Sequence, residues 1–474
     1  MLKLFLFCFF NNFIFSSSLI GVSLFSIGTE SYLINNNSNY IKTWNHSRSS
    51  VGTSYLINDR SIVVQLRAEQ HNFGASHGPI GGHFQKIDFD DQIIWEFFYY
   101  DSLYHPHHDF EPLSNGNILI ICWEKKSQSE VENYGRVNIN NQFWPLKIIE
   151  LMPIGTDSVD IVWEWHLWDH LIQDIDPDLP NYGSVQSHPE LLDINLVNFN
   201  NPNNGDWLHT NAIDYNETLD QIVFSSRFLD EIFIIDHSTT TEEASSHSGG
   251  NSGKGGDFLF RWGNPQNYGR GTQEDKVLND QHGVNWINNS FIGGGNLLIF
   301  NNNPLDTTGQ DHSIGNSSII EITPPINLDN SYFIDDENAF GPEDPILIYG
   351  GDSSFFSHFQ SGSYRLENGN TFTTVSQEKY IFELNVENEI VWELYVDSEE
   401  FTIGNIARAQ KYSLNYFNPL YGDVNSNFKV DVFDLIYLYD FIIYNDYSIN
   451  LDLNNDNQIN LGDFDILLDL IMNN

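Results

Sequence analysis

Histidine and arginine are the residues of this chain whose types and spacing best suit catalysis or ligand binding. The sequence holds 16 histidines, and several stand next to other polar residues at the ends of predicted strands. Four segments stand out: residues 104–110, 206–211, 224–227 and 279–283. They contain His107, His108, His209, Arg227 and His282. Two or three imidazoles and one guanidinium, if they meet, form a small cationic site that suits a compact anion.

A metal centre is the obvious alternative, because histidine is the commonest protein ligand of metals. The sequence has no His-Glu-x-x-His motif, and Arg227 would repel a cation. The spacing of His105 and His107 is ligand-like, but a single pair is weak evidence. Each histidine taken alone could also be a hydrogen-bonded residue of the core or surface. Only the combination favours an anion site.

Strands must position these residues. Between about residue 55 and residue 412, short runs of Ile, Val, Phe, Tyr and Trp alternate with Asn, Gly and Asp turns, and no helical period persists. Strands containing tryptophan recur at residues 91–97, 160–165, 258–262 and 389–394. Glycine turns enter apolar strands at residues 113–120, 294–300 and 366–372, and Asn-Gly supplies the positive φ angles of a tight hairpin.

The tryptophan spacing predicts a β-propeller. Trp95, Trp163, Trp262 and Trp392 are separated by 68, 99 and 130 residues. These intervals are close to one, one and a half and two units of about 65 residues, so roughly 355 residues would make six blades. We therefore expect an all-β, six-bladed β-propeller in which tryptophans anchor the core between blades. Strand ends from different blades would then converge on one central channel.

The C-terminal segment carries two loops rich in oxygen side chains. Its residues are Asp423, Asn425, Asn427, Asp431 and Asp434 in the first loop, and Asp452, Asn454, Asp456, Asn460 and Asp463 in the second. Both loops place oxygens at positions 1, 3, 5, 9 and 12, which is the ligand spacing of a calcium loop. Each leads into a helical apolar pattern, at an offset of 29 residues. The alternative is a solvated Asn- and Asp-rich tail.

Aspartate at position 12 and the short duplication resemble the type I dockerin repeat over residues 421–474. The resemblance implies a small all-α module, folded around structural calcium, that docks to a cohesin-like or cell-surface protein. The glycine usual at position 6 of a calcium loop is replaced by Phe428 and Asn457.

A second resemblance covers roughly residues 75–400. The string His107-His108-Asp109, the segment from Asp206 to Tyr215, Ser225-Ser226-Arg227, residues 261–265 and Gln281-His282 resemble the bacterial arylsulfate sulfotransferase family. This family is a six-bladed β-propeller. The resemblance implies transfer of a sulfuryl group from a phenolic sulfate donor to a phenolic acceptor, without a nucleotide sulfate donor or organic cofactor, through a sulfohistidine. By motif, His282 matches the nucleophile, His209 and Arg227 match sulfate-gripping positions, and His107 or His108 matches the last position, with His108 favoured.

Composition limits the partners and the compartment. The chain has 474 residues and a formal net charge of −45, which excludes a nucleic-acid partner. Residues 1–27 form an interrupted apolar run typical of a signal peptide, with a buried N-terminal strand as the alternative. No other stretch approaches a membrane span, so we expect an exported protein that is periplasmic, cell-surface or secreted. With only Cys8 and Cys122 present, removal of the leader would leave no intramolecular disulfide.

The expected organisation is a signal peptide at 1–27, an extension at 28–55, the propeller at 56–412, a linker at 413–420 and the dockerin-like domain at 421–474. The extension is too short for the N-terminal β domain of many bacterial enzymes of this type. A glycine- and serine-rich loop at 245–256 is an ordered insertion near the site or a flexible lid. Two other functions stay open: a non-catalytic propeller that binds sulfated or carbohydrate ligands, and a quinoprotein-like oxidoreductase, which the lack of vicinal cysteines disfavours.

Overall fold

The computed structural model describes residues 17–68, 73, 75, 78–138, 142–196, 205–303, 316–352, 354–396, 404–417, 422–425, 429–444, 451–454 and 458–473. The chain divides into two compact units. The larger comprises Met1–Leu56 and Ser61–Lys411, and the smaller comprises Ile57–Arg60 and Tyr412–Asn474.

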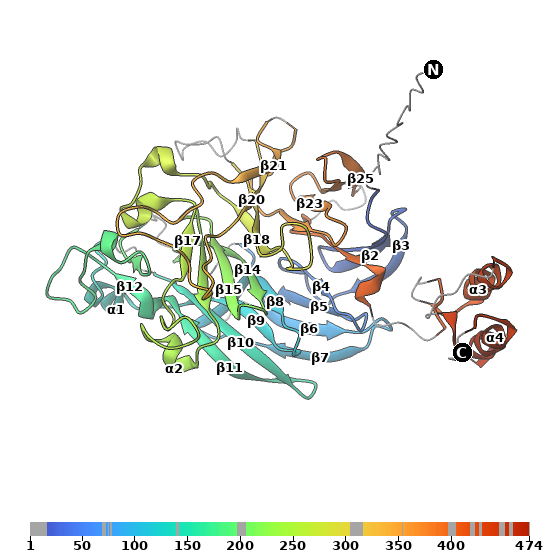
Figure 1. The fold of residues 1–474 in the computed structure, drawn as a ribbon. Coiled ribbons are helices and arrows are strands. Elements are labelled where there is room, and N and C mark those ends of the chain that lie inside the picture. Colours follow the sequence, from blue (N-terminus) through green and yellow to red (C-terminus); the bar gives the residue numbers. More distant parts are fainter. Residues whose placement is uncertain are drawn as a thin grey trace, which may run out of the picture. The chain divides into compact units, whose positions relative to one another are not determined.

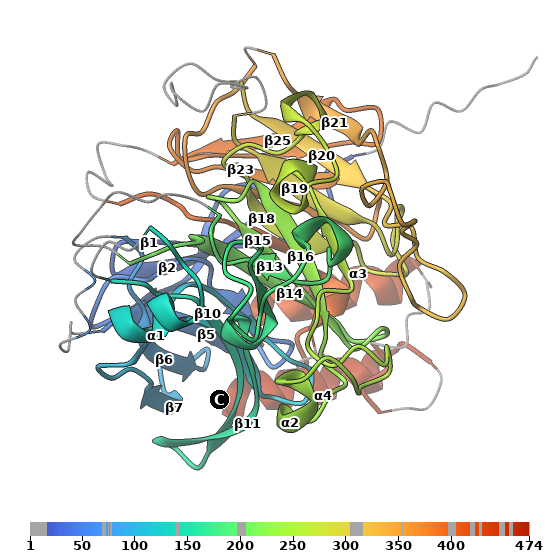
Figure 2. The ribbon, with the colours of Figure 1, turned by 90° about the vertical axis from the view of Figure 1, so that its left-hand side faces the viewer.

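Within the described residues, the larger unit is built on six four-stranded antiparallel sheets (Figures 1 and 2). The first contains β26 (Gln410–Ser413), which reaches the end of the larger unit at Lys411, together with β1 (Gly21–Ile27), β2 (Glu30–Asn35) and β3 (Tyr40–Asn45). The second contains β4 (Tyr55–Leu56), β5 (Ile62–Arg67), β6 (Gly82–Ile87) and β7 (Ile93–Phe98). The third contains β8 (Tyr104–Pro112), β9 (Ile118–Glu124), β10 (Leu146–Ile154) and β11 (Ser158–His166).

The fourth sheet contains β14 (Thr210–Asn216), β15 (Gln221–Ser226), β16 (Glu231–Asp236) and β17 (Phe260–Trp262). The fifth contains β18 (His282–Trp286), β19 (Leu297–Asn301), β20 (Ser318–Ile322) and β21 (Ile346–Gly350). The sixth contains β22 (Gly362–Arg365), β23 (Thr371–Val375), β24 (Tyr380–Leu384) and β25 (Ile390–Tyr395). The fold is a six-bladed β-propeller, and the prediction from tryptophan spacing is confirmed. Short elements connect the blades: α1 (Gln128–Asn133), α2 (Thr241–Ala244), and the parallel pair β12 (Leu171–Ile172) and β13 (Leu192–Asp193).

The first blade combines the two ends of the propeller, because β26 from residues 410–413 lies beside β1. All seven residues of β1 are buried. The structure therefore corrects two predicted boundaries. Residues 21–27 belong to a propeller strand rather than to a signal peptide, and residues 28–55 supply β2, β3 and the first residue of β4 rather than an extension. A leader and a strand buried on both faces have the same pattern, a continuous apolar run, so the sequence alone does not separate them. Residues 1–16 of the predicted leader lie outside the described residues.

Tryptophans on the outermost strands of four blades, the first, third, fourth and sixth, join each of these blades to the next. Their indole N–H groups donate hydrogen bonds across the blade boundary. The pairs are Trp44 with the Asp88 carbonyl (2.8 Å), Trp163 with Thr239 Oγ1 (3.1 Å), Trp262 with the Pro342 carbonyl (2.8 Å) and Trp392 with the Asn36 carbonyl (2.8 Å). A buried indole thus contributes apolar area and satisfies its donor at one boundary. This confirms the interpretation as anchors between blades for Trp163, Trp262 and Trp392.

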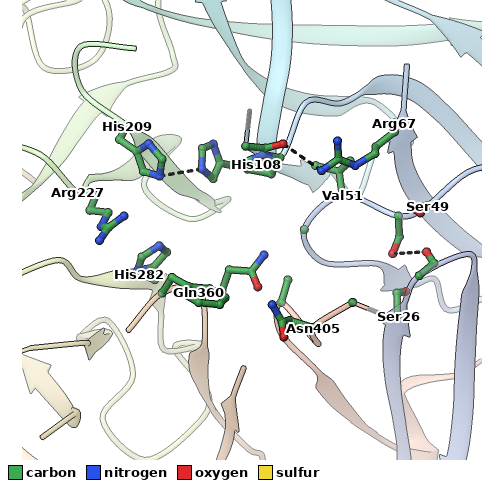
Figure 3. Close-up of a pocket in the computed structure, with 18 residues that line it drawn as sticks. Ser26, Ser49, Val51, Arg67, His108, His209, Arg227, His282, Gln360 and Asn405 are labelled. Atoms are coloured by element: carbon green, nitrogen blue, oxygen red, sulfur yellow. Dashed lines mark hydrogen bonds between the residues drawn. The ribbon is translucent and has the colours of Figure 1, made fainter. Parts of the chain in front are cut away.

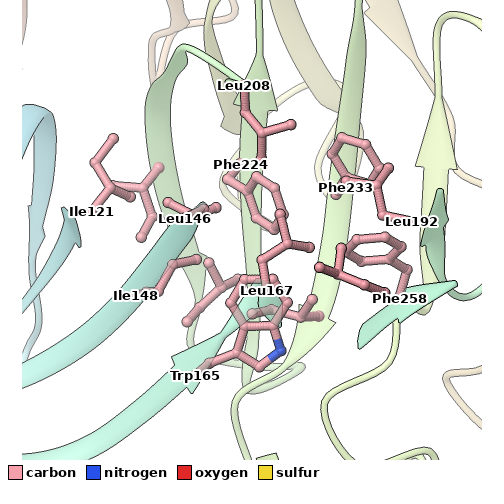
Figure 4. Close-up of a cluster of buried hydrophobic side chains, with 14 of the residues drawn as sticks. Ile121, Leu146, Ile148, Trp165, Leu167, Leu192, Leu208, Phe224, Phe233 and Phe258 are labelled. Atoms are coloured by element: carbon pink, nitrogen blue, oxygen red, sulfur yellow. The ribbon is translucent and has the colours of Figure 1, made fainter. Parts of the chain in front are cut away.

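Apolar side chains fill the space between blades. The cluster between the third and fourth blades includes Trp165, Phe224, Phe233 and Phe258, all nearly inaccessible to solvent (Figure 4). Truncating one such aromatic residue to alanine removes about 3–5 kcal/mol of stability. Rigid packing of this kind fixes the inner strands against one another, and β14 lies beside both β8 and β18.

The smaller unit contains α3 (Val432–Tyr444) and α4 (Leu461–Asn473), which pack together around Leu435, Leu438 and Leu467. No helix in the described part of the chain is long and apolar enough to cross a membrane.

Candidate active site

A cavity of about 500 Å³ brings together His108, His209, Arg227 and His282 (Figure 3). These residues come from the third, fourth and fifth blades, 174 positions apart at the extremes of the sequence. The remaining wall includes Arg67, Val51, Pro79, Phe359, Gln360 and Ala407. The sequence analysis predicted that strand ends from different blades would converge, and the structure brings these four predicted residues together.

Interruptions in the strand ladders aim the histidines into the cavity. The β8–β9 register shifts between Pro106 and Phe110, which brackets His108. The β14–β15 register shifts just after His209, and the β18–β19 register shifts at His282 itself. A bulge bends its strand and re-aims a side chain. The same local device therefore recurs at the first strand of three successive blades.

Two of these histidines adopt the left-handed backbone conformation. His108 has φ 53° and His209 has φ 50°, a region that only a few per cent of non-glycine residues occupy, although histidine enters it more often than most. Such residues persist where the surrounding fold enforces them, and they cluster at functional sites.

His282 has a defined tautomer. Its Nδ1 lies 2.9 Å from the Asp280 carbonyl oxygen and 2.8 Å from Asn302 Oδ1. The Asn302 orientation is fixed because its Nδ2 donates to the Ser357 and Gln360 carbonyls. Both neighbours of Nδ1 are thus acceptors, so Nδ1 carries the proton. Burial and the charge of Arg227 hold the pKa of His282 well below its ordinary value of 6.5, and the neutral ring keeps a lone pair on Nε2.

His209 and His108 form a chain of imidazoles that ends on a carboxylate. His209 Nδ1 lies 2.7 Å from Asp206 Oδ2, and His209 Nε2 lies 3.2 Å from His108 Nε2. Asp206 Oδ1 accepts from the Trp123 indole at 2.9 Å, which fixes the carboxylate. A carboxylate on one imidazole nitrogen sets the tautomer and stabilises the imidazolium form.

His107 lies behind His108 and does not line the cavity. Its Nδ1 is 2.7 Å from His108 Nδ1, and its ring stacks on Trp123 at 4.2 Å. Burial lowers the pKa of His107 to about 3. Of the two neighbouring candidates, His108 therefore faces the cavity and His107 supports it from the core. His105 is also buried, with its ring stacked on Tyr100.

Arg227 completes a positive lining. Its Nε donates to Asp280 Oδ1 at 2.8 Å, and its guanidinium points between His209 and His282 (Figure 3). Among the described residues that line the cavity, Arg67 is a second cation and none is a carboxylate. The site is thus a cationic pocket inside a chain with net charge −45. Low-dielectric walls strengthen its attraction for a small anion.

Sequence reasoning did not single out Asp206, Asp280 and Asn302 as functional residues. Asp206 and Asp280 stand within the segments that carried His209 and His282, so their proximity was the available signal. The sequence held no signal for Asn302, because this residue reaches His282 only through the pairing of β18 with β19.

Comparison with known proteins identifies the propeller. A family model for arylsulfotransferases (ASST) matches residues 81–377, more than half of the chain. The chain belongs to the arylsulfotransferase family. This arylsulfotransferase match encloses all four residues of the cavity that the motifs indicated. No curated protein sequence matches the chain.

Three solved structures similar to this family member have low sequence identity to it. A protein of unknown function from Bacteroides caccae is 11% identical with a TM-score of 0.44, over 82% of this chain and 98% of its own. The periplasmic gluconolactonase PpgL of Pseudomonas aeruginosa is 10% identical with a TM-score of 0.37, over 84% of this chain and 85% of its own. Apo AztD of Citrobacter koseri is 8% identical with a TM-score of 0.35, over 83% of this chain and 99% of its own.

The candidate calcium loops repeat the same hydrogen bonds. In the first, Asp434 accepts from the backbone N–H groups of Asn425 and Asp431 at 3.0 and 2.8 Å. In the second, Asp463 accepts from those of Asn454 and Asn460 at 3.2 and 2.8 Å. Asp434 and Asp463 are fully buried. Of the ten predicted ligands, Asn427 and Asp456 lie outside the described residues.

Proposed function

We propose that this protein is an aryl-sulfate sulfotransferase that needs no nucleotide sulfate donor and carries the sulfuryl group on His282. The tautomer of His282 is the observation that carries the proposal. A neutral imidazole with its proton held on Nδ1 has a nucleophilic lone pair on Nε2, and this histidine lines a cationic cavity. Membership of the arylsulfotransferase family supports the same reaction class.

In the first step, His282 Nε2 attacks the sulfur of a phenolic sulfate ester. A nitrogen–sulfur bond forms, the bond between sulfur and the phenolic oxygen breaks, and the phenolate leaves with the bonding pair. The Arg227 guanidinium faces the three non-bridging oxygens. It stabilises the negative charge that spreads over these oxygens in the transition state. A proton from His209, backed by Asp206, reaches the departing oxygen, and His108 holds His209 in place.

In the second step, the acceptor phenol gives its proton back to the unprotonated His209. Its oxygen attacks the sulfur, the nitrogen–sulfur bond breaks, and neutral His282 is restored. The two half-reactions share one site, so the kinetics are ping-pong. The apolar part of the cavity wall, made of Val51, Pro79, Phe359 and Ala407, suits the aromatic ring of donor and acceptor.

The alternative function, a propeller that only binds sulfated ligands, makes a different prediction. Incubation with p-nitrophenyl sulfate and phenol is expected to release p-nitrophenol faster than the donor alone does, because phenol regenerates free His282. His282→Ala is expected to lose this release while it still melts cooperatively. Absence of release from the parent protein, with and without phenol, would contradict the enzyme and favour the binding function.

The remaining proposals concern the C-terminal module and the compartment. We propose that the two loops bind structural calcium and that the module docks to a cohesin-like or cell-surface protein. The buried oxygens of Asp434 and Asp463 fit a hard cation, and they already close each loop onto its own backbone. Calcium would supply charge neutralisation and fold the loops. We further propose that the protein is exported, with a leader that ends before the propeller strand β1.

A further inference from the structure

A second cluster of imidazoles lies in the outer part of the propeller, in residues that do not line the cavity. His170, His247 and Asp257 each offer one ligand-type atom, and these atoms all lie within 4.8 Å of one another. We propose that this cluster is a zinc site that fastens the connection between β16 and β17 to the preceding blade. Among the described residues it is the one group with this geometry.

The three ligands come from two blades. His170 ends the 3-10 helix Leu167–His170, which directly follows β11 of the third blade. His247 and Asp257 belong to the long connection between β16 and β17 of the fourth blade. An ion bound by all three would cross-link the connection to its neighbour, and this is the mechanical role that we assign to it.

The proton positions on His170 call for a cation. His170 Nε2 lies 2.8 Å from the Ala244 carbonyl, which can only accept, so Nε2 carries a proton. Neutral His170 then has a lone pair on Nδ1, and that atom lies 2.7 Å from Asp257 Oδ1. Two lone pairs at this distance repel each other. Either a second proton or a metal ion must lie between them.

A second imidazole converges on the same carboxylate oxygen, which completes a metal-type donor set. His247 Nδ1 lies 2.8 Å from the same oxygen, Asp257 Oδ1. Two imidazole nitrogens and one carboxylate oxygen form a donor set that suits zinc, whereas calcium and magnesium prefer oxygen alone. Zinc bonds of about 2.0–2.1 Å in tetrahedral geometry place ligand atoms roughly 3.3 Å apart. The contacts of His170 Nδ1 and His247 Nδ1 with Asp257 Oδ1 therefore need to widen by only about half an ångström.

The surroundings hold the ligands in place. The His170 ring lies parallel to Trp165, at 5.4 Å and 3°. The Trp165 indole donates to the Gly256 carbonyl at 2.7 Å. A Cβ on Gly256 would lie 2.0 Å from the Ala244 oxygen and 2.6 Å from His170 Nε2, so only glycine permits this approach. The hydrogen bond from His170 to Ala244 is the outer-shell contact typical of metal-bound histidine.

Solvent reaches the cluster from the His247 side. The His247 side chain is 62% exposed, whereas those of His170 and Asp257 are 0% and 8% exposed. An ion can therefore enter past His247, and water can supply the fourth ligand. None of residues 239–256 lines the cavity. Of the two interpretations of the glycine- and serine-rich loop, the structure thus favours an ordered insertion, though one apart from the catalytic cavity.

The test compares the full-length protein with two single variants, in buffer that contains calcium so that the C-terminal loops are not available to zinc. His247→Ala removes the exposed ligand. His188→Ala is the matched control, because His188 is 48% exposed and its Nδ1 also pairs with a carboxylate, that of Glu190 at 2.8 Å, outside the cluster. Each protein is stripped with chelator, loaded with zinc, freed of excess by gel filtration and analysed for bound metal.

We expect His247→Ala to retain one zinc equivalent fewer than the parent, with His188→Ala equal to the parent. Cobalt(II) in place of zinc should give strong tetrahedral visible absorption in the parent and control and lose it in His247→Ala. Zinc should also raise the melting temperature of the parent and not that of His247→Ala. Equal zinc content in His247→Ala and the parent, or no retained zinc in the parent, would overturn the proposal and leave His170 as a protonated partner of Asp257. The release of p-nitrophenol reports separately on the catalytic cavity.

Discussion

His108 and His209 come from neighbouring blades, yet their Nε2 atoms lie 3.2 Å apart. One of the two must donate and the other accept. His209 is in turn held by Asp206, whose carboxylate lies 2.7 Å from His209 Nδ1. The proton carried by this pair is therefore shared between two blades and is placed at the wall of the cavity. In the reaction proposed above, this pair is the acid that protonates the departing phenolate.

Asp206→Asn tests this role of Asp206 as a positioning residue. The variant removes the negative charge that supports protonated His209, so we expect kcat to fall by about 10²-fold or more. The loss should grow as the leaving phenol becomes less acidic, because a poor leaving group depends most on the proton. Steady-state rates across a series of substituted phenyl sulfates measure this dependence. A loss that is the same for every phenol would mean that Asp206 acts only on structure.

Arg227→Lys tests the anion grip. Lysine keeps the charge but lacks the planar fork that holds an oxyanion with several donors. We expect about a 10²-fold loss in kcat/KM. Arg67→Lys is the matched control in the wall of the same cavity, where Arg67 Nη2 bonds to the Gly78 carbonyl, and it should lose much less. The reverse order of losses would assign the sulfate to Arg67.

His237 is expected to make stability depend on pH. Burial lowers the pKa of His237, but hydrogen bonds to Asp220 (2.7 Å) and Glu150 (3.0 Å) outweigh it and raise the pKa to about 9. Because this value lies above the ordinary 6.5, the stabilisation is complete below pH 6.5 and is lost as pH rises to about 9. The shift corresponds to about 3 kcal/mol at most, reduced because Asp220 is 37% exposed.

Melting temperatures at pH 6 and pH 9.5 measure the effect. The parent should lose more stability over this interval than His237→Gln does. His188→Gln, at an exposed histidine, should behave as the parent. An identical pH dependence in the parent and His237→Gln would contradict the assignment.

Calcium removal tests the C-terminal loops. Asp434 and Asp463 occupy equivalent positions, so Asp434→Asn should lower the calcium stoichiometry of the full-length protein from two to one, and Asp463→Asn should do the same. Isothermal titration of the chelator-treated protein measures this, and the rate of p-nitrophenol release should stay unchanged. No calcium uptake by the parent would leave the segment as a pair of helices without metal.

The sequence was sufficient for the blade count because tryptophans recur on the outermost strands, where each must anchor one blade to the next. It was sufficient for His209, Arg227, His282 and the pair His107 and His108, because each stands in a polar segment at a strand end. The start of the propeller could not be predicted this way. Residues 21–27 are buried on both faces, and such a strand has no polar alternation to separate it from a leader.

Contacts between different strands and blades determine the features of the sites that the sequence did not predict. Asn302 orients His282 through a neighbouring strand, and His170 meets His247 and Asp257 across two blades. No local pattern encodes such contacts, since they depend on register and on the angle between blades. The choice between His107 and His108 likewise depended on the bulge that turns one of them into the cavity.

The central claim is that His282 carries the sulfuryl group, and mass spectrometry of the protein quenched after mixing with p-nitrophenyl sulfate in the absence of acceptor tests it most directly. We expect one added SO3 group, located on the peptide that contains His282, which disappears when phenol is supplied and does not form in His282→Ala. An SO3 group on another residue, or none while p-nitrophenol is released in a stoichiometric burst, would contradict it.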